Sequence, residues 1–199
     1  SHFQSSFIIG TFPSLKINIE NFKSIKEYLL SFGINRLEQS GKSGARKKAP
    51  NKWYETQDTI AYWKEISKPK IIWKRIGSIL RFCYDETGTY SLDSTCIATG
   101  EHLKYLVALL NSKLINKELN RYAPKTGTGD LIISVQALEP LKIPIPTEEQ
   151  EIPFVNLVDK IIEAKKQNKD TSALESEIDT LVYKLYNLIP EEISIIENQ

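Results

Sequence analysis

The sequence predicts an α+β fold, with a mixed, largely antiparallel sheet flanked by helices and followed by a C-terminal α-helical hairpin. Three observations predict it: short β-rich segments fill residues 70–99, helical periodicities flank them, and residues 148–199 carry amphipathic helical repeats. The chain has 199 residues, of which 41% are hydrophobic and 26% charged. This is enough apolar surface for a packed core, so disordered, collagen-like and disulfide-scaffold classes are excluded.

The first predicted helix covers about residues 21–32, where apolar side chains recur every three or four positions before a stop at Gly33. Residues 39–52 (QSGKSGARKKAPNK) contain two glycines, a proline and five cations, with almost no apolar side chain. We expect a loop there that is mobile or ordered by a partner. The segment TIAYWKEI that follows predicts a short helix, ended by Pro69.

Three strands are predicted next, at Lys70–Ile76, Ser78–Asp85 and Thr89–Thr99. The sequence Asp-Glu-Thr-Gly at residues 85–88 is typical of a turn, so we pair the last two strands as a hairpin.

A helix is predicted from about Glu101 to Arg121 because leucine and valine side chains line one face of it. Residues 121–135 (RYAPKTGTGDLIISV) then indicate a second loop that runs into a strand. The prolines that follow indicate an extended connection outside the central sheet, at Pro140, Pro144, Pro146 and Pro153.

The C-terminal part predicts two helices and a short terminal one. Thr147 with Gln150 is a capping-box pattern for a helix to about Lys166, and Ser172 with Glu175 is another for a helix to about Leu188. This hairpin must bury its apolar stripe, against either the preceding domain or a partner domain. We therefore predict a recognition domain at residues 1–147 and a helical tail, a spacer or docking hairpin, at 148–199.

Charge is strongly segregated although the whole chain carries only +1. Residues 36–75 have a net charge of +7, and residues 148–199 have a net charge of −7. Such asymmetry favours a polyanion as the partner of the basic region, and protein as the partner of the acidic tail.

Catalytic and metal-ligating patterns are poor. Only two histidines and two cysteines occur, and Gly127-Thr128-Gly129 lacks the rest of a phosphate-binding motif. A metal-dependent nuclease built from Asp159, Glu163 and Lys165 is a remaining alternative, but helical spacing explains these residues as surface charge. We predict no catalytic residue, no metal site and no cofactor in this chain.

No apolar stretch is long enough to span a bilayer, and a reducing cytoplasm is expected. The absence of methionine, even at position 1, suggests a piece of a longer polypeptide.

Binding chemistry is concentrated in residues 46–75, where all three tryptophans alternate with cations. Lysines on a flexible loop attract phosphates, while Arg46, Asn51 and Gln57 could donate hydrogen bonds to base edges. The predicted DNA contacts are Lys42, Ser43, Arg46, Lys47, Lys48, Asn51, Lys52, Trp53 and Tyr54, with a second loop contributing Lys125, Thr126 and Thr128.

Five segments resemble, in the same order, the TaqI-like C-terminal specificity region of bacterial restriction–modification enzymes, mostly of type IIG. They are ARKKAPNKWYETQDTIAYWKEISKPKIIWKRI, YSLDSTCIAT, LKYLVALLNSKL, LKIPIPTEEQ and LVYKLYNLIPEEISIIE. The resemblance implies a cytoplasmic bacterial module that reads a short duplex DNA sequence for an attached adenine methyltransferase and endonuclease. It also implies S-adenosylmethionine and Mg²⁺ in the parent enzyme.

The sequence departs from the full enzyme because it contains no Asn-Pro-Pro-Tyr motif and no glycine-rich cofactor motif. We therefore expect this chain not to be an enzyme by itself. The alternative function is a protein–protein interaction module that works through the amphipathic C-terminal helices.

Overall fold

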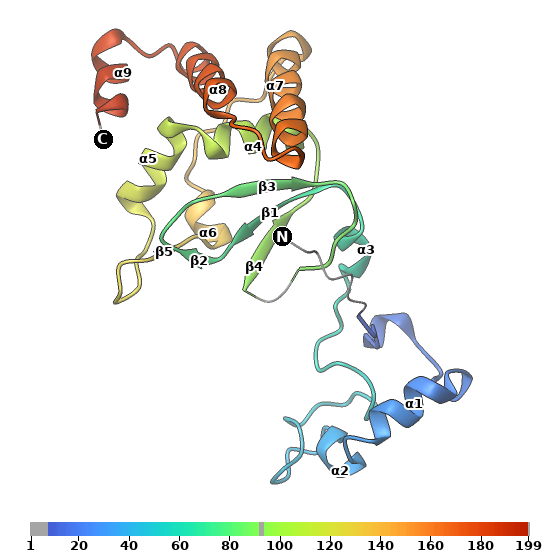
Figure 1. Cartoon of the computed structure of the whole chain (residues 1–199). Coiled ribbons are helices and arrows are strands. Elements are labelled where there is room, and N and C mark those ends of the chain that lie inside the picture. Colours follow the sequence, from blue (N-terminus) through green and yellow to red (C-terminus); the bar gives the residue numbers. More distant parts are fainter. Residues whose placement is uncertain (1–7, 92–93, 199) are drawn as a thin grey trace. The chain divides into compact units, whose positions relative to one another are not determined.

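The computed structural model describes residues 8–91 and 94–198. The chain forms two compact units, unit 1 (Ser1–Lys64) and unit 2 (Glu65–Gln199). Nine α-helices accompany two small antiparallel sheets in the described residues, so the α+β class is confirmed (Figure 1). The functional boundary at residue 147 stays a prediction, because compact units report packing and not function.

Unit 1 begins with two short 3₁₀ helices, η1 (Pro13–Leu15) and η2 (Ile19–Asn21). Helix α1 (Lys23–Leu30) follows and confirms the first predicted helix within narrower bounds. Gly33 has a φ of 88° and ends this region, as the glycine stop required. A short helix that the sequence analysis did not predict, α2 (Ile34–Leu37), comes directly after it.

The main sheet of unit 2 has the order β3–β1–β4. Its strands are β1 (Lys70–Lys74), β3 (Phe82–Asp85) and β4 (Thr95–Ala98), and the short helix α3 (Trp63–Ile66) precedes them. The predicted hairpin between the second and third strands is wrong, because both of these strands pair with β1 and not with each other. The more buried β1 takes the central place, and the turn at residues 85–88 does not join paired strands.

A second, two-stranded sheet joins β2 (Ile76–Gly77) to β5 (Leu131–Ile132). The predicted strands at 70–76 and 78–85 are therefore too long, because the chain leaves the main sheet after Lys74 to pair elsewhere. The strand predicted to follow the second loop has only two residues, and the short helix α6 (Val135–Leu138) replaces its remainder.

The single helix predicted from 101 to 121 is two helices, α4 (Leu103–Asn111) and α5 (Lys113–Tyr122). Ser112 lies between them in an extended conformation and caps α5. The Ser112 hydroxyl accepts a hydrogen bond from the backbone N–H of Ile115. The carboxylate of Asp179 accepts another at the same helix start, from the backbone N–H of Lys113 at 2.8 Å. The distant Asp179 therefore satisfies a free donor at the start of α5, a contact that periodicity alone does not reveal.

Three helices end the chain: α7 (Glu148–Lys166), α8 (Ser172–Leu185) and α9 (Pro190–Glu197). The capping box of Thr147 and Gln150 is confirmed. Two details were wrong: Pro153 lies inside α7 and not in the extended connection, and Thr171, not Ser172, is the residue before α8.

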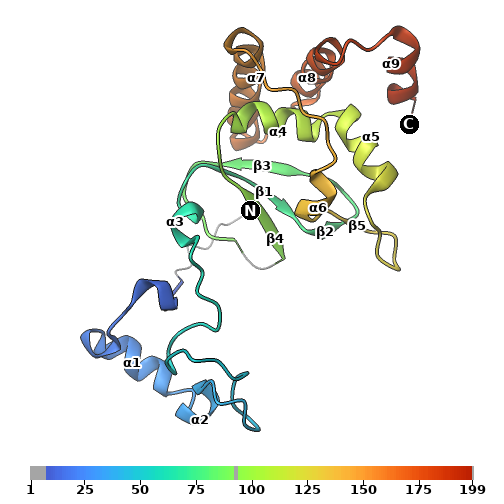
Figure 2. The same cartoon turned by 180° about the vertical axis from the view of Figure 1, so that it is seen from behind.

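One core unites the sheet and the helices of unit 2. Helix α4 packs on β1 and β3, and α7 and α8 pack on α4 and on each other (Figures 1 and 2). Ile178 and Val182 of the predicted apolar stripe of α8 are buried in this core. The C-terminal hairpin therefore packs against the preceding part of the same chain, which is the first of the two predicted alternatives. Trp73 is also a core residue, and its indole N–H donates to the carbonyl of Ile133 at 2.8 Å.

Candidate nucleic-acid interface

The basic stretch of unit 1 folds into a loop with its own hydrogen-bond network. We call residues 38–57 the cationic loop. Its two arms are joined by backbone hydrogen bonds from Arg46 N to Glu38 O (3.0 Å), from Gly41 N to Arg46 O (3.0 Å) and from Ala49 N to Gln39 O (3.1 Å). Gly41 and Gly44 have positive φ values of 72° and 80°, which explains glycine at these two positions of the tip. The loop therefore has a defined path without a partner.

Arg46 holds the two arms of the cationic loop together. Its guanidinium donates from Nε to the carbonyl of Leu37 (2.8 Å), from Nη1 to that of Glu55 (2.9 Å) and from Nη2 to that of Trp53 (2.5 Å). Partial burial lowers the pKa of Arg46, although an arginine remains charged at any physiological pH. Contact of Arg46 with DNA stays a prediction, and the structure adds a role in shaping the loop.

The side-chain amides of Asn51 and Gln57 also donate hydrogen bonds to backbone carbonyls inside the loop. The Asn51 amide donates to the carbonyls of Thr56 (2.9 Å) and Gln57 (2.7 Å), and the Gln57 amide donates to that of Lys47 (2.9 Å). The amide groups that the sequence analysis considered for base edges are therefore engaged with the backbone.

Two residues of this network were missed by sequence reasoning. Buried Gln39 donates from Nε2 to the carbonyls of Lys52 (3.1 Å) and Glu55 (2.9 Å). The carboxylate of buried Glu55 accepts a hydrogen bond from the backbone N–H of Lys52 at 2.8 Å. At this three-residue spacing a glutamate can accept a hydrogen bond from the backbone N–H of Lys52, and this signal could have identified Glu55. Gln39 has no such local signal, because its acceptors lie 13 and 16 residues away.

The aromatic pair of the loop anchors it to the rest of unit 1. Tyr54 is buried, and its hydroxyl donates to the carbonyl of Ile17 at 2.7 Å. The half-buried Trp53 meets the Tyr54 ring edge-on, with 5.4 Å between the ring centroids. Lys52 Nζ lies 5.6 Å from the centroid of the Tyr54 ring, and hydrogen bonding and charge interaction with the Tyr54 side chain raise the pKa of Lys52. Tyr54 therefore has a packing role in the structure.

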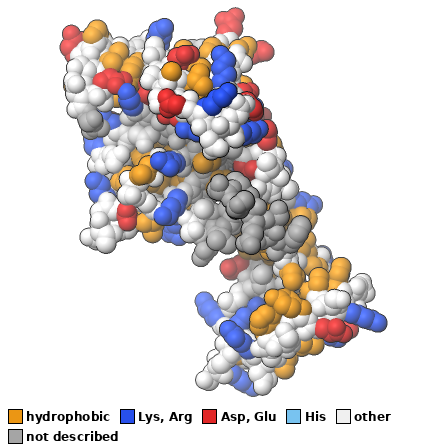
Figure 3. Space-filling model, viewed as in Figure 1, with side chains coloured by type: hydrophobic (Ala, Val, Ile, Leu, Met, Phe, Trp, Pro, Cys, Tyr) orange, Lys and Arg blue, Asp and Glu red, His pale blue; other side chains and the backbone are white. Residues whose placement is uncertain are grey.

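The exposed groups of the loop are different residues. Lys42, Ser43, Lys47 and Lys48 are exposed, and none of these four side chains has an ion pair within the part of the chain that the structure describes. Lys42 and Ser43 lie at the tip, while Lys47 and Lys48 lie on the returning arm. Figure 3 shows Lys and Arg side chains together with hydrophobic ones on the visible face of unit 1. The loop thus exposes these lysines to solvent, while side-chain hydrogen bonds from Arg46, Asn51 and Gln57 hold its backbone.

The second predicted loop belongs to unit 2. Lys125 forms a bridge with Leu131 of β5, and its side chain is exposed. The hydroxyls of Thr126 and Thr128 lie 2.8 Å apart, and that of Thr126 accepts a hydrogen bond from the backbone N–H of Asp130. These two threonines shape the turn, and the Lys125 side chain pairs with no residue in the described part of the chain.

The residues of the nuclease alternative have separate partners. Asp159 pairs with Lys104 (2.5 Å), Lys165 pairs with Glu175 (3.0 Å), and Glu163 accepts from the side chain of Gln167 (2.7 Å). Among residues 8–91 and 94–198, no group of three or more His, Cys, Asp or Glu side chains is arranged to hold a metal ion. Asp159 and Lys165 therefore form surface ion pairs, and Glu163 forms a hydrogen bond within its own helix.

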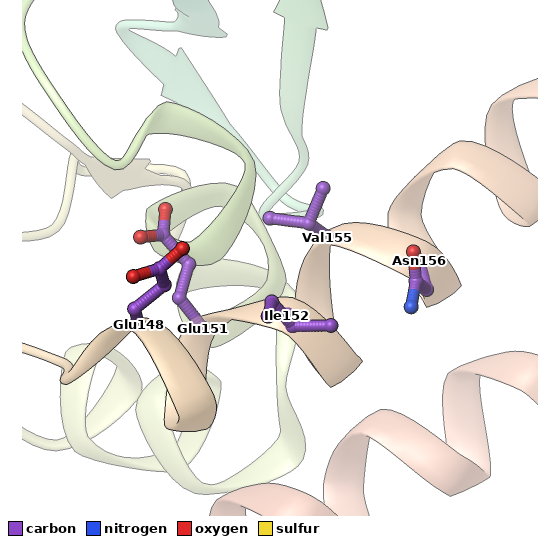
Figure 4. A pocket seen from close by; sticks show the side chains of 5 residues that line it. All are labelled: Glu148, Glu151, Ile152, Val155 and Asn156. Atoms are coloured by element: carbon purple, nitrogen blue, oxygen red, sulfur yellow. The ribbon is translucent and has the colours of Figure 1, made fainter.

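A small hollow lies at the start of α7 (Figure 4). It measures about 140 Å³, and its lining residues, Glu148, Glu151, Ile152, Val155 and Asn156, all belong to that helix. Glu151 is already hydrogen-bonded to Nδ1 of His102 at 2.7 Å. The hollow is therefore a groove on one helix surface and does not gather groups from several elements.

In the described part of the chain, no helix is both long and apolar enough to span a bilayer.

The fold and the cationic loop together define an α+β module with a preformed basic surface. A family model described as the TaqI-like C-terminal specificity domain matches residues 18–145. This match covers more than half of the chain, including the cationic loop and the sheet, and it ends before α7. The chain belongs to the family of TaqI-like C-terminal specificity domains. This family indicates a role in DNA recognition for restriction–modification enzymes, and a specificity domain is not itself the catalytic part.

Proposed function

We propose that this chain is the sequence-specific DNA recognition module of a bacterial restriction–modification enzyme of type IIG. It directs an attached adenine methyltransferase and endonuclease to their site on double-stranded DNA in the cytoplasm. The observation that carries this proposal is that Arg46, Asn51 and Gln57 donate to backbone carbonyls, while the side chains of Lys42, Lys47 and Lys48 are exposed and pair with no residue that the structure describes.

In this proposal Lys47 and Lys48 bind phosphates and position the loop on the duplex. Phosphate contacts of this kind supply affinity but carry no sequence information. Lys42 and Ser43 reach base edges from the tip, because a lysine can donate to O6 and N7 of guanine and a serine hydroxyl can both donate and accept. Since the loop path is fixed in advance, little conformational entropy is lost when the loop meets DNA.

The cofactors of the parent enzyme belong to the attached domains in this proposal. S-adenosylmethionine supplies the methyl group there, and Mg²⁺ supports strand cleavage. Among the described residues, no group of three or more His, Cys, Asp or Glu side chains is arranged to hold a metal ion, and the Gly127–Gly129 turn is followed by β5 and not by a helix. In this proposal the chain itself binds and orients DNA.

The test is binding of the chain to a mixed-sequence duplex over a series of salt concentrations, together with selection of preferred sequences from random duplexes. Affinity should fall steeply with salt, by about 0.9 log units per log unit of salt for each neutralised phosphate. The double variant Lys47→Ala/Lys48→Ala should reduce this slope by about 2 while leaving the selected sequence unchanged.

The control is Lys160→Ala/Lys184→Ala, which removes the same charge from exposed positions of α7 and α8. A chain that binds no duplex even at low salt would contradict the proposal and leave the protein-interaction module as the alternative. Equal loss of affinity in the loop variant and in this control would show that net charge, and not the loop, is responsible.

A further inference from the structure

Four cations from three segments of the chain lie where the chain leaves one end of the main sheet of unit 2 for the second sheet. Trp73 of β1 pairs with Phe82 of β3, so Lys74, the last residue of β1, and Arg75 lie at the same end of the main sheet as Arg81, which precedes Phe82. Gly77 of β2 pairs with Leu131 of β5, and Leu131 forms a bridge with Lys125. We call Lys74, Arg75, Arg81 and Lys125 the cationic sheet end.

These cations lack the acidic partners that other cations of unit 2 have. Residues 71–84 contain three cations and no Asp or Glu. All four side chains are exposed, and none of them forms an ion pair with any residue that the structure describes. By contrast, Lys70 pairs with Asp85 at 2.5 Å and Arg121 pairs with Glu118 at 3.1 Å. Like charges on neighbouring strands repel one another, so an anion that binds between them relieves this repulsion.

The backbone beneath these side chains is fixed. The N–H of Arg75 donates to the carbonyl of Ser94 at 2.9 Å, and the carbonyl of Arg75 accepts from the N–H of Ile133 at 2.8 Å. Exposed Ile76 and Ile79 lie between the cations along the chain, with exposed fractions of 41% and 63%. Figure 3 shows basic side chains among hydrophobic ones on the face of unit 2 over β2 and β5. A surface of this kind offers cations to phosphates and apolar groups to deoxyribose.

We propose that the cationic sheet end binds the phosphodiester backbone of duplex DNA, as a second contact surface in addition to the cationic loop. The inference rests on the proposed function, since it supplies a further site for the same partner. A polyanion with regularly spaced charges fits best, because four cations on three segments can meet more than one phosphate. An acidic protein is the other kind of partner that such a surface could bind, and the experiment separates the two.

The experiment measures binding of the whole chain to a mixed-sequence duplex by fluorescence anisotropy at several salt concentrations. Arg75→Ala/Arg81→Ala should weaken binding roughly tenfold at moderate salt and reduce the salt slope by about 2. Arg75→Lys/Arg81→Lys keeps the charge and should restore most of the slope. Lys160→Ala/Lys184→Ala is the matched control for net charge, and circular dichroism verifies that each variant is folded.

The outcomes separate this inference from the proposed function. If the unmodified chain binds no duplex, both fall. If it binds, and Lys47→Ala/Lys48→Ala weakens binding while Arg75→Ala/Arg81→Ala matches the control, the proposed function stands and this inference is overturned in favour of another anionic partner. A loss in Arg75→Ala/Arg81→Ala that the lysine variant rescues supports the second contact surface.

Discussion

Replacing Arg46 by alanine should loosen the cationic loop before it alters any DNA contact. The change removes three charge-assisted hydrogen bonds, to the carbonyls of Leu37, Trp53 and Glu55. Such a bond contributes about 1.5–3 kcal/mol when shielded from water and less when partly exposed, as here. The carbonyl of Glu55 also keeps its bond from Gln39. We therefore expect a loss of about 2–4 kcal/mol in the free energy of opening the loop.

Native-state hydrogen exchange measures this opening. The amides of Gly41, Arg46 and Ala49 bond across the loop, and they should exchange roughly 30- to 1,000-fold faster in Arg46→Ala. Arg46→Lys should also fail to protect them, since an ammonium cannot span three carbonyls in a plane.

The matched control is Arg36→Ala, which removes an exposed arginine from α2. DNA affinity of Arg46→Ala should fall uniformly over all sequences. Unchanged exchange together with a loss confined to one base pair would refute this reasoning and make Arg46 a base-reading residue.

Three further predictions concern unit 2. Asp85→Asn should lower the free energy of unfolding, measured by denaturant titration, by about 3–5 kcal/mol, because it leaves the fully buried Lys70 unpaired. Lys70→Met should lower it much less, because no buried charge remains. Equal losses in the two variants would contradict this prediction. Burial raises the pKa of Asp179, so its folded form holds a proton more tightly and stability falls as pH rises from the unfolded pKa through the folded one. Asp179→Asn should flatten that fall in unfolding free energies measured against pH, and an unchanged profile would argue against it. Leu109→Ala should cost about 2–5 kcal/mol in the core, while Ile145→Ala, at 88% exposure, should change the melting temperature little.

Local signals were enough to predict the helices of the C-terminal part. Thr147 and Gln150 form the capping box that their spacing implies, because both partners lie within one turn. The same kind of signal failed at Ser112. The run of residues 101–121 has continuous helical periodicity, and the break depends on a cap that includes Asp179 from another helix. Periodicity reports which face is apolar and says nothing about such a distant acceptor.

Sheet order was also beyond local reasoning. The turn at residues 85–88 exists, with the Asp85 carboxylate accepting from the N–H of Thr87, yet it does not join paired strands. Which strand becomes central is decided by burial, and β1 has both the buried Trp73 and partners on each side. A turn motif predicts a change of chain direction and leaves the pairing open.

The location of the candidate interface could be inferred from composition, but the role of each of its side chains could not. Lys42, Lys47 and Lys48 are exposed, as predicted cation contacts must be. Arg46 and Asn51 have equally suitable chemistry for DNA, and the structure uses that chemistry on backbone carbonyls instead. Residue type alone cannot distinguish these two uses, because both need hydrogen-bond donors on a loop.

The core of unit 1 explains why so many donors of the loop face inward. Its buried described residues are Thr11, Ile19, Gln39, Tyr54 and Glu55, of which only Ile19 and Tyr54 are mainly apolar. Burial of so little apolar surface cannot fix the path of a long loop, so hydrogen bonds to backbone carbonyls must do so. Because these bonds end on backbone atoms, the exposed side chains at the tip can change without altering the path. A recognition module built in this way can acquire a new DNA sequence preference through its free side chains while Arg46 and its neighbours keep the loop in place.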